Sequence, residues 1–218
     1  EILRGKDIDL TGTEIVKGGK TFYWKGKYHN DLNSRDTLIT DLNTLADFDP
    51  KVPDHFKDAD VVMLGNLHPS IQLSVINQME VRPKLIVLDT MNFWMDNTLD
   101  ELKEVIKHID VITINDEEAR QLTEEYSLVK AAAAIQEMGP KYVVIKKGEH
   151  GALLFHDEKV FFAPALPLEE VFDPTGAGDT FAGGFSGYLA ATDNMSFKNL
   201  KNAVIHGSNL ASFCVERF

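Results

Sequence analysis

The residues best suited to chemistry lie in the stretch 173–186, which reads Asp-Pro-Thr-Gly-Ala-Gly-Asp-Thr-Phe-Ala-Gly-Gly-Phe-Ser. Gly176, Ala177 and Gly178 allow a tight turn before a helix that we expect to start near Asp179. The N–H groups at a helix start carry partial positive charge and bind anions such as phosphate. A carboxylate there repels a bound anion, so Asp179 suits a different task, the removal of a proton from a hydroxyl that attacks phosphorus. The alternative is that Asp179 caps the helix.

Two other phosphate-binding motifs are excluded in this stretch. The dinucleotide pattern G-x-G-x-x-G fails after Gly176 and Gly178, because Phe181 occupies the third glycine position. The nucleoside-triphosphate loop G-x-x-x-x-G-K-[ST] also fails, because Gly184 stands where lysine is required. What remains is an anion site with a neighbouring carboxylate.

The elements that must position this site alternate between short apolar runs and helical patterns. We expect strands at 61–65, 84–88, 111–114 and 142–146, and helices at 69–79, 99–108, 116–125 and 128–138. The strands start 23, 27 and 31 residues apart, a spacing typical of β-α-β units with right-handed crossovers. The sequence therefore predicts an α/β fold, doubly wound, with a mostly parallel sheet flanked by helices.

Three further segments depart from this pattern. Residues 12–16 and 21–29, around Gly18-Gly19, are predicted as a β-hairpin in which Phe22, Trp24 and Tyr28 share one face. That aromatic face is either a packed core face or a cover for a ligand. Residues 152–155 and 160–162 are predicted as a second hairpin, residues 30–53 as a segment with a mobile loop, and the chain after Phe172 as helical.

The stretch 173–186 resembles the second signature of the PfkB (ribokinase-like) family of carbohydrate kinases. Residues 115–118 and 146–151 are similar to two further family elements in the expected order, the N-x-x-E element and the nucleotide loop. The resemblance covers the chain well from about Val61 and the N-terminal hairpin more loosely. It implies a ribokinase-like sheet with a small β lid near the N-terminus, and ATP and Mg²⁺ as cofactors.

Within that resemblance, Asn115 and Glu118 help to hold Mg²⁺ and phosphate, largely through water. Their own position agrees, because they follow a predicted strand at the edge where open α/β sheets place ligands. Oxygen ligands with intervening water also suit Mg²⁺. The structural alternative, compatible with the first, is that Asn115 caps the helix and Glu118 completes a capping box.

The resemblance assigns ATP binding to the loop that contains Lys146, Lys147, Gly148, Glu149 and Gly151. There the backbone at a strand end approaches the nucleotide. From the residues alone, the same segment is a strand-turn-strand connection. Lys147 either neutralises phosphate charge or is solvated.

Near the chain end, Asn209 and Ala211 lie where the last helices of the family approach the adenine, so Asn209 is a further nucleotide-binding candidate. Cys214 is expected to be a buried thiol of the last helix. The seven histidines show no metal-ligand spacing, so structural zinc is not expected.

The composition limits the kinds of binding partner and the location that we expect. With 34 Asp+Glu against 22 Lys+Arg, the formal charge is −12, which disfavours nucleic acid and anionic membrane surfaces. The apolar runs are far shorter than the roughly 18 residues of a membrane span. A single cysteine and the absence of a signal peptide in the sequence given favour the cytoplasm.

Together these features predict an ATP-dependent phosphotransferase that acts on a hydroxyl of a sugar or nucleoside, with Asp179 as general base and residues 176–179 as the anion hole. A pyridoxal or hydroxymethylpyrimidine kinase of the same fold and a non-catalytic nucleotide sensor are the alternatives. Asp173 to Asp179 favours the sugar branch, and a sensor has little use for Asp179.

The N-terminal residues 1–30 are expected to form the hairpin of a lid or flanking sheet, and residues 31–218 the nucleotide-binding core. The family's opening strand, substrate-binding aspartate and glycine-rich first signature do not precede Glu1, so we expect N-terminal and C-terminal parts of the family fold to be missing. The aromatic residues Phe22, Trp24 and Tyr28 make the N-terminal hairpin a candidate surface for a homodimer.

Overall fold

The computed structural model describes residues 3–30, 32 and 35–216 and contains two β-sheets. The strands are β1 (Tyr23–Tyr28), β2 (Arg35–Asp41), β3 (Val61–Leu64), β4 (Leu85–Asp89), β5 (Val111–Asn115), β6 (Tyr142–Lys146), β7 (Ala152–His156) and β8 (Lys159–Ala163). The helices are α1 (Pro69–Gln78), α2 (Asn92–Asn97), α3 (Leu99–Ile106), α4 (Asp116–Thr123), α5 (Leu128–Met138), α6 (Ala177–Thr192) and α7 (Phe197–Glu216).

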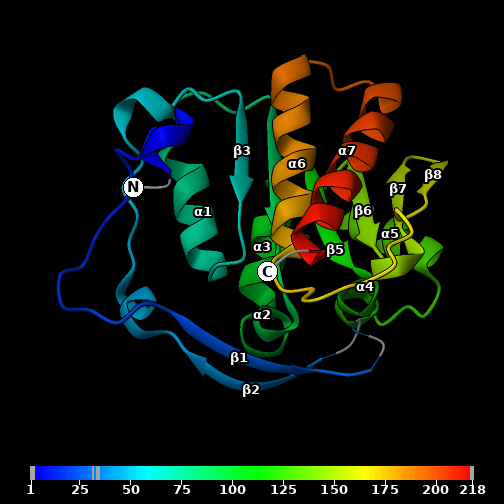
Figure 1. Cartoon of the computed structure of the whole chain (residues 1–218). Coiled ribbons are helices and arrows are strands. Elements are labelled where there is room, and N and C mark those ends of the chain that lie inside the picture. Colours follow the sequence, from blue (N-terminus) through cyan, green and yellow to red (C-terminus); the bar gives the residue numbers. More distant parts are fainter. Residues whose placement is uncertain (1–2, 31, 33–34, 217–218) are drawn as a thin grey trace.

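The large sheet has the strand order β3-β4-β5-β6-β7-β8. Strands β3 to β6 pair in parallel, whereas β6, β7 and β8 pair antiparallel. Strands β1 and β2 form a separate antiparallel sheet. Figure 1 shows this small sheet lying across the end of the core toward which β3 runs. The small sheet thus faces the carboxyl edge of the parallel strands, where open α/β folds bind ligands.

Alternate residues of the central strands feed two separate cores. In β4, Ile86 and Leu88 pack with α1, α3, α4 and α5, whereas Leu85 and Val87 pack with α6 and α7. All five β4 residues are buried, as the continuous apolar run of a parallel strand covered on both faces requires. The predicted α/β fold with helices on both faces is confirmed. The helices between the parallel strands share one face, and α6 and α7 cover the other (Figure 1).

Most elements of the core agree with the prediction to within about two residues. All four parallel strands, the β7–β8 hairpin and the two C-terminal helices are present. Helix α2 was not predicted. No helix in the described part of the chain combines the length and the apolar character that a membrane crossing requires.

The predicted N-terminal hairpin is wrong in its pairing. Residues 12–16 form no strand, and Tyr23–Tyr28 pairs instead with Arg35–Asp41. Part of the segment 30–53, expected as a loop, is therefore strand β2 and the short 3-10 helix η2 (Asn43–Asp47); its residues 31, 33 and 34 lie outside the described residues. The small sheet spans both sides of the boundary that we expect at residue 30. The predicted aromatic face is confirmed for two of its three residues. Trp24 and Tyr28 are half-buried and meet edge to face, whereas Phe22 is exposed.

Glycine permits the close contact between α6 and α7. An added Cβ at Gly184 would lie 2.7 Å from a Leu210 methyl group, and one at Gly207 would lie 2.7 Å from the Phe181 carbonyl oxygen. Gly183 and Gly187 have open space around them. The closely packed glycines are therefore Gly184 and Gly207. This contact fixes α6, and with it the residues at its first turn.

Candidate active site

Helix α6 begins without a side-chain cap. Its N-cap is Gly176, in the left-handed conformation with φ +82°, and no side chain accepts from the first-turn N–H groups. The first helical bond runs from the Thr180 N–H to the Gly176 carbonyl at 2.9 Å. The Ala177 N–H donates to the Pro174 carbonyl at 3.1 Å, so it belongs to the turn. Among the described residues, the N–H groups of Gly178 and Asp179 have no acceptor.

This arrangement refines two expectations. Asp179 is the third residue of the helix and not its cap, so the structural alternative for Asp179 is wrong. In the predicted anion hole of residues 176–179, the Ala177 N–H is already used, whereas those of Gly176, Gly178 and Asp179 have no acceptor among the described residues.

The loop before α6 is held from two distant parts of the chain. The Tyr28 hydroxyl of β1 lies 3.1 Å from the Thr175 hydroxyl, and the Cys214 thiol of α7 points to the Thr175 carbonyl at 3.7 Å. Within the loop, the Thr175 N–H donates to an Asp173 carboxylate oxygen at 2.8 Å. Cys214 is half-buried and not fully buried as expected. Its position beside this loop was also not predicted.

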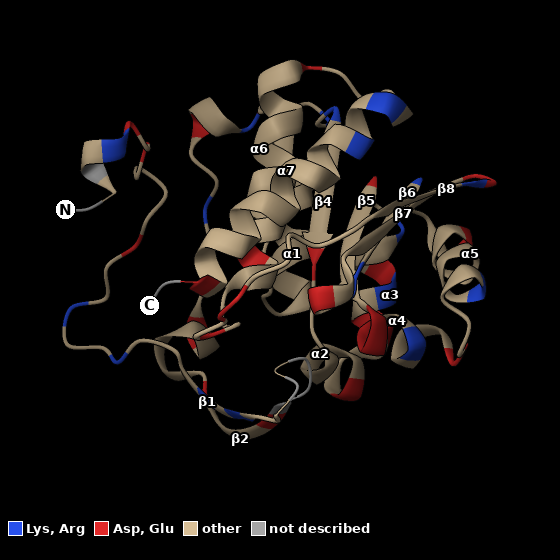
Figure 2. Ribbon diagram, turned by 45° about the vertical axis from the view of Figure 1, so that its right-hand side comes forward, with Lys and Arg blue, Asp and Glu red and all other residues tan. Residues whose placement is uncertain are grey.

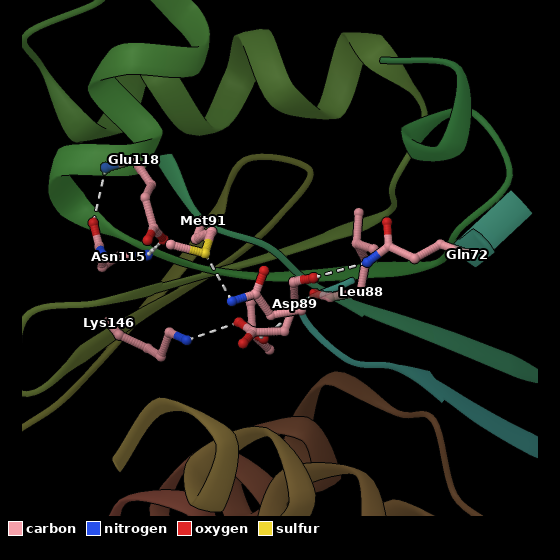
Figure 3. A network of polar contacts seen from close by, with 9 residues as sticks. Gln72, Leu88, Asp89, Met91, Asn115, Glu118 and Lys146 are labelled. Carbon is pink, nitrogen blue, oxygen red and sulfur yellow. Dashed lines mark hydrogen bonds and ion pairs between the residues drawn. The ribbon is translucent and has the colours of Figure 1, made fainter. Parts of the chain in front are cut away.

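A largely buried ion pair lies near the start of α6. Figure 3 shows the Lys146 ammonium directed at Asp89, and the distance between Nζ and Oδ1 is 2.9 Å. Asp89 is 5% exposed and also accepts a hydrogen bond from the Thr113 hydroxyl at 3.1 Å. A Cβ added to Gly178 would lie only 3.2 Å from Lys146 Nζ. The ammonium thus lies close to Gly178 in the first turn of α6.

The pKa values at this site reflect burial and neighbouring charge. Burial, followed by the charge of Asp89, raises the pKa of the Asp179 carboxyl above its ordinary value, while Lys146 opposes the rise. Burial acts to lower the pKa of the Lys146 ammonium, but Asp89, Glu118 and Asp179 outweigh it and raise that pKa. Lys146 therefore stays cationic among carboxylates, and Asp179 has a raised affinity for a proton, which suits a general base.

Acidic residues also line the surrounding edge. In Figure 2, Asp and Glu appear on segments that lie between the core sheet and the β1–β2 sheet. Without a counter-charge this edge repels a polyphosphate, and the Lys146 ammonium and the α6 N–H groups are attractive groups that the described residues supply there.

Asn115 and Glu118 form the capping box that was the structural alternative. The Asn115 amide oxygen accepts the Glu118 N–H at 2.8 Å, and the Glu118 carboxylate accepts the Asn115 N–H at 2.9 Å (Figure 3). Glu118 is 3% exposed. Among the described residues, no three His, Cys, Asp or Glu side chains cluster as direct metal ligands. A carboxylate and an amide engaged in this way fit an Mg²⁺ ion that keeps its water and is held mainly by a polyphosphate.

Residues 146–151 form a tight connection between the antiparallel strands β6 and β7. The Lys147 N–H donates to the Gly151 carbonyl at 2.8 Å, and Gly148 and Glu149 lie in the 3-10 helix η4 (Gly148–His150). Gly151 has φ +83°, and an added Cβ would lie 2.0 Å from the Ala163 carbonyl oxygen. Glycine is required there by the fold itself. Of this loop, the structure brings Lys146 alone into contact with the site around Asp179.

Asn209 lies on the exposed side of α7, where its carbonyl accepts a hydrogen bond from the Ser212 hydroxyl at 2.7 Å. Among the described residues, its side chain makes no hydrogen bond to the loop before α6. The structure therefore adds nothing to its candidacy for adenine binding.

Asp89 is the site residue that sequence reasoning missed. It ends β4, an otherwise apolar and fully buried strand. A carboxylate at the carboxyl end of a buried parallel strand follows the same rule that singled out Asn115. That signal was present in the sequence and was not used.

Comparison with known proteins agrees with this fold and site. The profile of the pfkB family of carbohydrate kinases matches residues 3–218, so the chain belongs to that family. It is 32% identical to a cytidine kinase of Thermococcus kodakarensis over 187 residues, covering 83% of this chain and 66% of that protein. It is 30% identical to a nucleoside kinase of Methanothermobacter thermautotrophicus, covering 99% of this chain and 67% of that protein. The chain thus spans about two thirds of these relatives.

Solved structures show the same fold at lower identity. A fructokinase from Vibrio cholerae, with fructose, ADP and calcium ion bound, superposes with a TM-score of 0.76 at 18% identity, covering 98% of this chain and 73% of that one. A nucleoside kinase from Methanocaldococcus jannaschii has a TM-score of 0.74 at 19% identity, with coverage of 99% and 68%.

Proposed function

We propose that this chain carries the phosphoryl-transfer site of an ATP-dependent kinase that phosphorylates a hydroxyl of a sugar or nucleoside. The observation that carries the proposal is the uncapped start of α6, where N–H groups without acceptors, the Lys146 ammonium and the Asp179 carboxylate lie close together. Membership of the pfkB family supports it.

In this proposal Asp179 is the general base. Its raised pKa favours acceptance of the acceptor hydroxyl proton as the oxygen attacks the γ-phosphorus. The N–H groups of Gly178 and Asp179 stabilise the charge on the transferring phosphoryl group, and Gly176 and Ala177 shape the turn that presents them. Lys146 contributes a positive charge close to Gly178, held in place by Asp89.

The nucleotide is proposed to lie over the β6–β7 connection, with Lys147, Gly148, Glu149, Gly151 and, on α7, Asn209 along its path. Asn115 and Glu118 would hold Mg²⁺ through water at the start of α4. When bound, Mg²⁺ offsets phosphate charge that the acidic edge otherwise repels. The chain's own part there is to keep the Glu118 carboxylate fixed through the capping box.

A screen of ADP release by the full-length protein, with sugars, sugar phosphates and nucleosides as acceptors, tests the proposal. We expect ADP release that depends on one acceptor class and on Mg²⁺. ATP binding with no turnover of any acceptor would instead identify a nucleotide sensor. Turnover of pyridoxal or hydroxymethylpyrimidine alone would identify a vitamin-type kinase.

We also propose a domain arrangement, a dimer surface and a location for the protein. The β1–β2 sheet, which spans both sides of residue 30, forms a lid, and the chain from β3 onward forms the kinase core. Phe22, Tyr23, Leu38 and Ile39 are exposed on or beside β1 and β2, which supports a homodimer through this sheet. A cytoplasmic location follows from the single cysteine.

A further inference from the structure

The last residue of β1 contacts the loop before α6. Tyr28 is half-buried, and its hydroxyl oxygen lies 3.1 Å from the hydroxyl oxygen of Thr175. The small sheet lies at the same end of the core as this loop (Figure 1). The contact therefore joins the small sheet to the turn from which α6 begins.

Thr175 occupies a position from which a displacement reaches the site. It directly precedes Gly176, the N-cap of α6, whose carbonyl accepts the first hydrogen bond of the helix. The Ala177 N–H donates to the Pro174 carbonyl at 3.1 Å, so the residues on either side of Thr175 belong to one turn. A shift of Thr175 is therefore passed on to the first turn of α6, which carries Asp179.

Helix α7 holds the main chain of the same loop. The Phe172 N–H donates to the Val215 carbonyl at 2.9 Å, and the Cys214 thiol points to the Thr175 carbonyl at 3.7 Å. Tyr28 instead engages the side chain of Thr175. The loop is thus held on one side by the core and on the other by the small sheet.

The Tyr28 ring is itself supported within the small sheet. The Trp24 indole meets it edge to face, with centroids 6.4 Å apart and planes at 68°. The same indole lies over Gly26, where an added Cβ would be 2.1 Å from a ring carbon. The Trp24 indole N–H donates to the Thr37 hydroxyl of β2 at 3.3 Å. The position of Tyr28 is therefore set by both strands of the small sheet.

The contact between Tyr28 and Thr175 brings no charge to the site. Both partners are hydroxyl groups, and each can donate or accept. Its loss therefore changes the position of the turn without adding or removing a charge near Asp179. This separates its expected effect from that of Lys146, whose charge acts on the pKa of Asp179.

We infer that Tyr28 is a positioning residue for phosphoryl transfer. Through the Thr175 hydroxyl it fixes the turn that presents the Gly178 and Asp179 N–H groups and the Asp179 carboxylate. Small displacements of catalytic groups have large effects on rate, so a single hydrogen bond to this turn matters for kcat. This inference rests on the proposed kinase function and gives a residue of the small sheet a part in the chemical step.

Two substitutions in the full-length protein remove one hydroxyl each and keep the shape of the side chain, Tyr28→Phe and Thr175→Val. We expect each to lower kcat by about three- to tenfold, the scale of one hydrogen bond, with the ATP Kd and the acidic limb of the pH profile unchanged. Thr175→Ser keeps the hydroxyl and is expected to keep kcat near that of the parent. Tyr23→Phe, exposed at the other end of β1, is the matched control.

The double variant tests whether the two hydroxyls act through each other. Partners in one hydrogen bond are coupled, so Tyr28→Phe with Thr175→Val is expected to lower kcat no further than either substitution alone. Effects that multiply in the double variant would overturn the inference, because the two residues would then act independently.

Hydrogen exchange of residues 173–180 reports the position of the turn directly. We expect faster exchange in Tyr28→Phe and in Gly26→Ala, which displaces the Trp24 ring, but not in Tyr23→Phe. Unchanged kcat and exchange in Tyr28→Phe would overturn the inference and leave the kinase proposal intact. A raised acceptor KM with unchanged kcat would also overturn it, because Tyr28 would then serve binding alone. No phosphoryl transfer by the parent protein would overturn both proposals.

Discussion

Helices α4 and α6 both begin at the carboxyl edge of the sheet, and their first turns are built in opposite ways. In α4, Asn115 and Glu118 satisfy each other's N–H groups in a closed capping box. In α6, Gly176 supplies no side chain, and the N–H groups of Gly178 and Asp179 have no acceptor among the described residues. One helix start is completed by its own side chains, and the other is left open among the described residues.

The largest effect is expected when Asp179, at the uncapped start of α6, is neutralised. We expect Asp179→Asn to lower kcat by between about 10² and 10⁴, because a general base contributes on that scale, with little change in ATP affinity. Steady-state kinetics and ATP titration of the full-length protein measure both. Asp193→Asn, at the other end of α6, is the control for the loss of one carboxylate from this helix. A kcat near that of the parent in Asp179→Asn would remove the general-base assignment.

The positive charge of Lys146, near the start of α6, is expected to make the next largest contribution to kcat. Lys146→Met is expected to lower kcat by about 10² or more, in line with the loss of one group that stabilises transition-state charge. Because Lys146 lowers the pKa of Asp179, its removal raises that pKa further, and activity is lost at higher pH as the base becomes protonated. The acidic limb of the kcat/KM profile therefore moves to higher pH.

Asp89→Asn provides the opposite shift. It removes a charge that raises the pKa of Asp179, so the acidic limb moves to lower pH. Loss of either partner also leaves a buried charge unpaired and destabilises the fold by about 3–5 kcal/mol, so thermal unfolding is measured alongside. If the acidic limb shifted in the same direction in Lys146→Met and Asp89→Asn, the electrostatic coupling to Asp179 would be contradicted. Destabilisation alone would lower the height of the kcat/KM profile and leave the pH of its limbs unchanged.

A methyl group added at Gly178 tests how closely the first turn of α6 must pack against Lys146. In Gly178→Ala the new Cβ lies 3.2 Å from Lys146 Nζ, and one of the two must shift. We expect kcat/KM to fall by between about tenfold and a hundredfold, because small displacements of catalytic groups have effects of that size. Gly187→Ala, in open space on the same helix, is expected to keep activity and to gain up to about 1 kcal/mol of stability. Equal effects of the two substitutions would show that the position of Gly178 is not special.

The smallest effect is expected at the closed helix start. Glu118→Gln preserves a capping box but removes the negative charge, so the Mg²⁺ concentration for half-maximal rate should rise by about tenfold while the Tm changes little. Glu117→Gln, exposed in the same turn, controls for the helix dipole. A lower Tm with an unchanged Mg²⁺ requirement would assign Glu118 a purely structural role.

The sequence predicted the structure correctly where one physical pattern, such as an apolar run, was strong. Apolar runs such as Val111–Asn115 are buried on both faces and therefore carry the same residue types that predict them. The first turn of α6 was predicted because Gly176 and Gly178 allow the tight turn that precedes the helix.

Pairing and long-range contacts were not predictable in this way. Gly18 does lie in a turn, with φ +76°, and the Gly19 N–H donates to the Val16 carbonyl at 3.2 Å, yet residues 12–16 form no strand that pairs across this turn. The partner of β1 is β2, whose alternation of charged and apolar residues is weak. The ion pair between Asp89 and Lys146 joins residues 57 positions apart, and no local pattern encodes that distance.

The contacts of Thr175 have a consequence for the order of assembly during synthesis. Its hydroxyl meets Tyr28, 147 positions earlier, and its carbonyl meets Cys214, 39 positions later. Strands β3 to β6 can pair while the rest of the chain is still being made, because their contacts are comparatively local. The loop before α6 reaches its final shape only after α7 has left the ribosome, so a nascent kinase core is expected to be folded before it is competent.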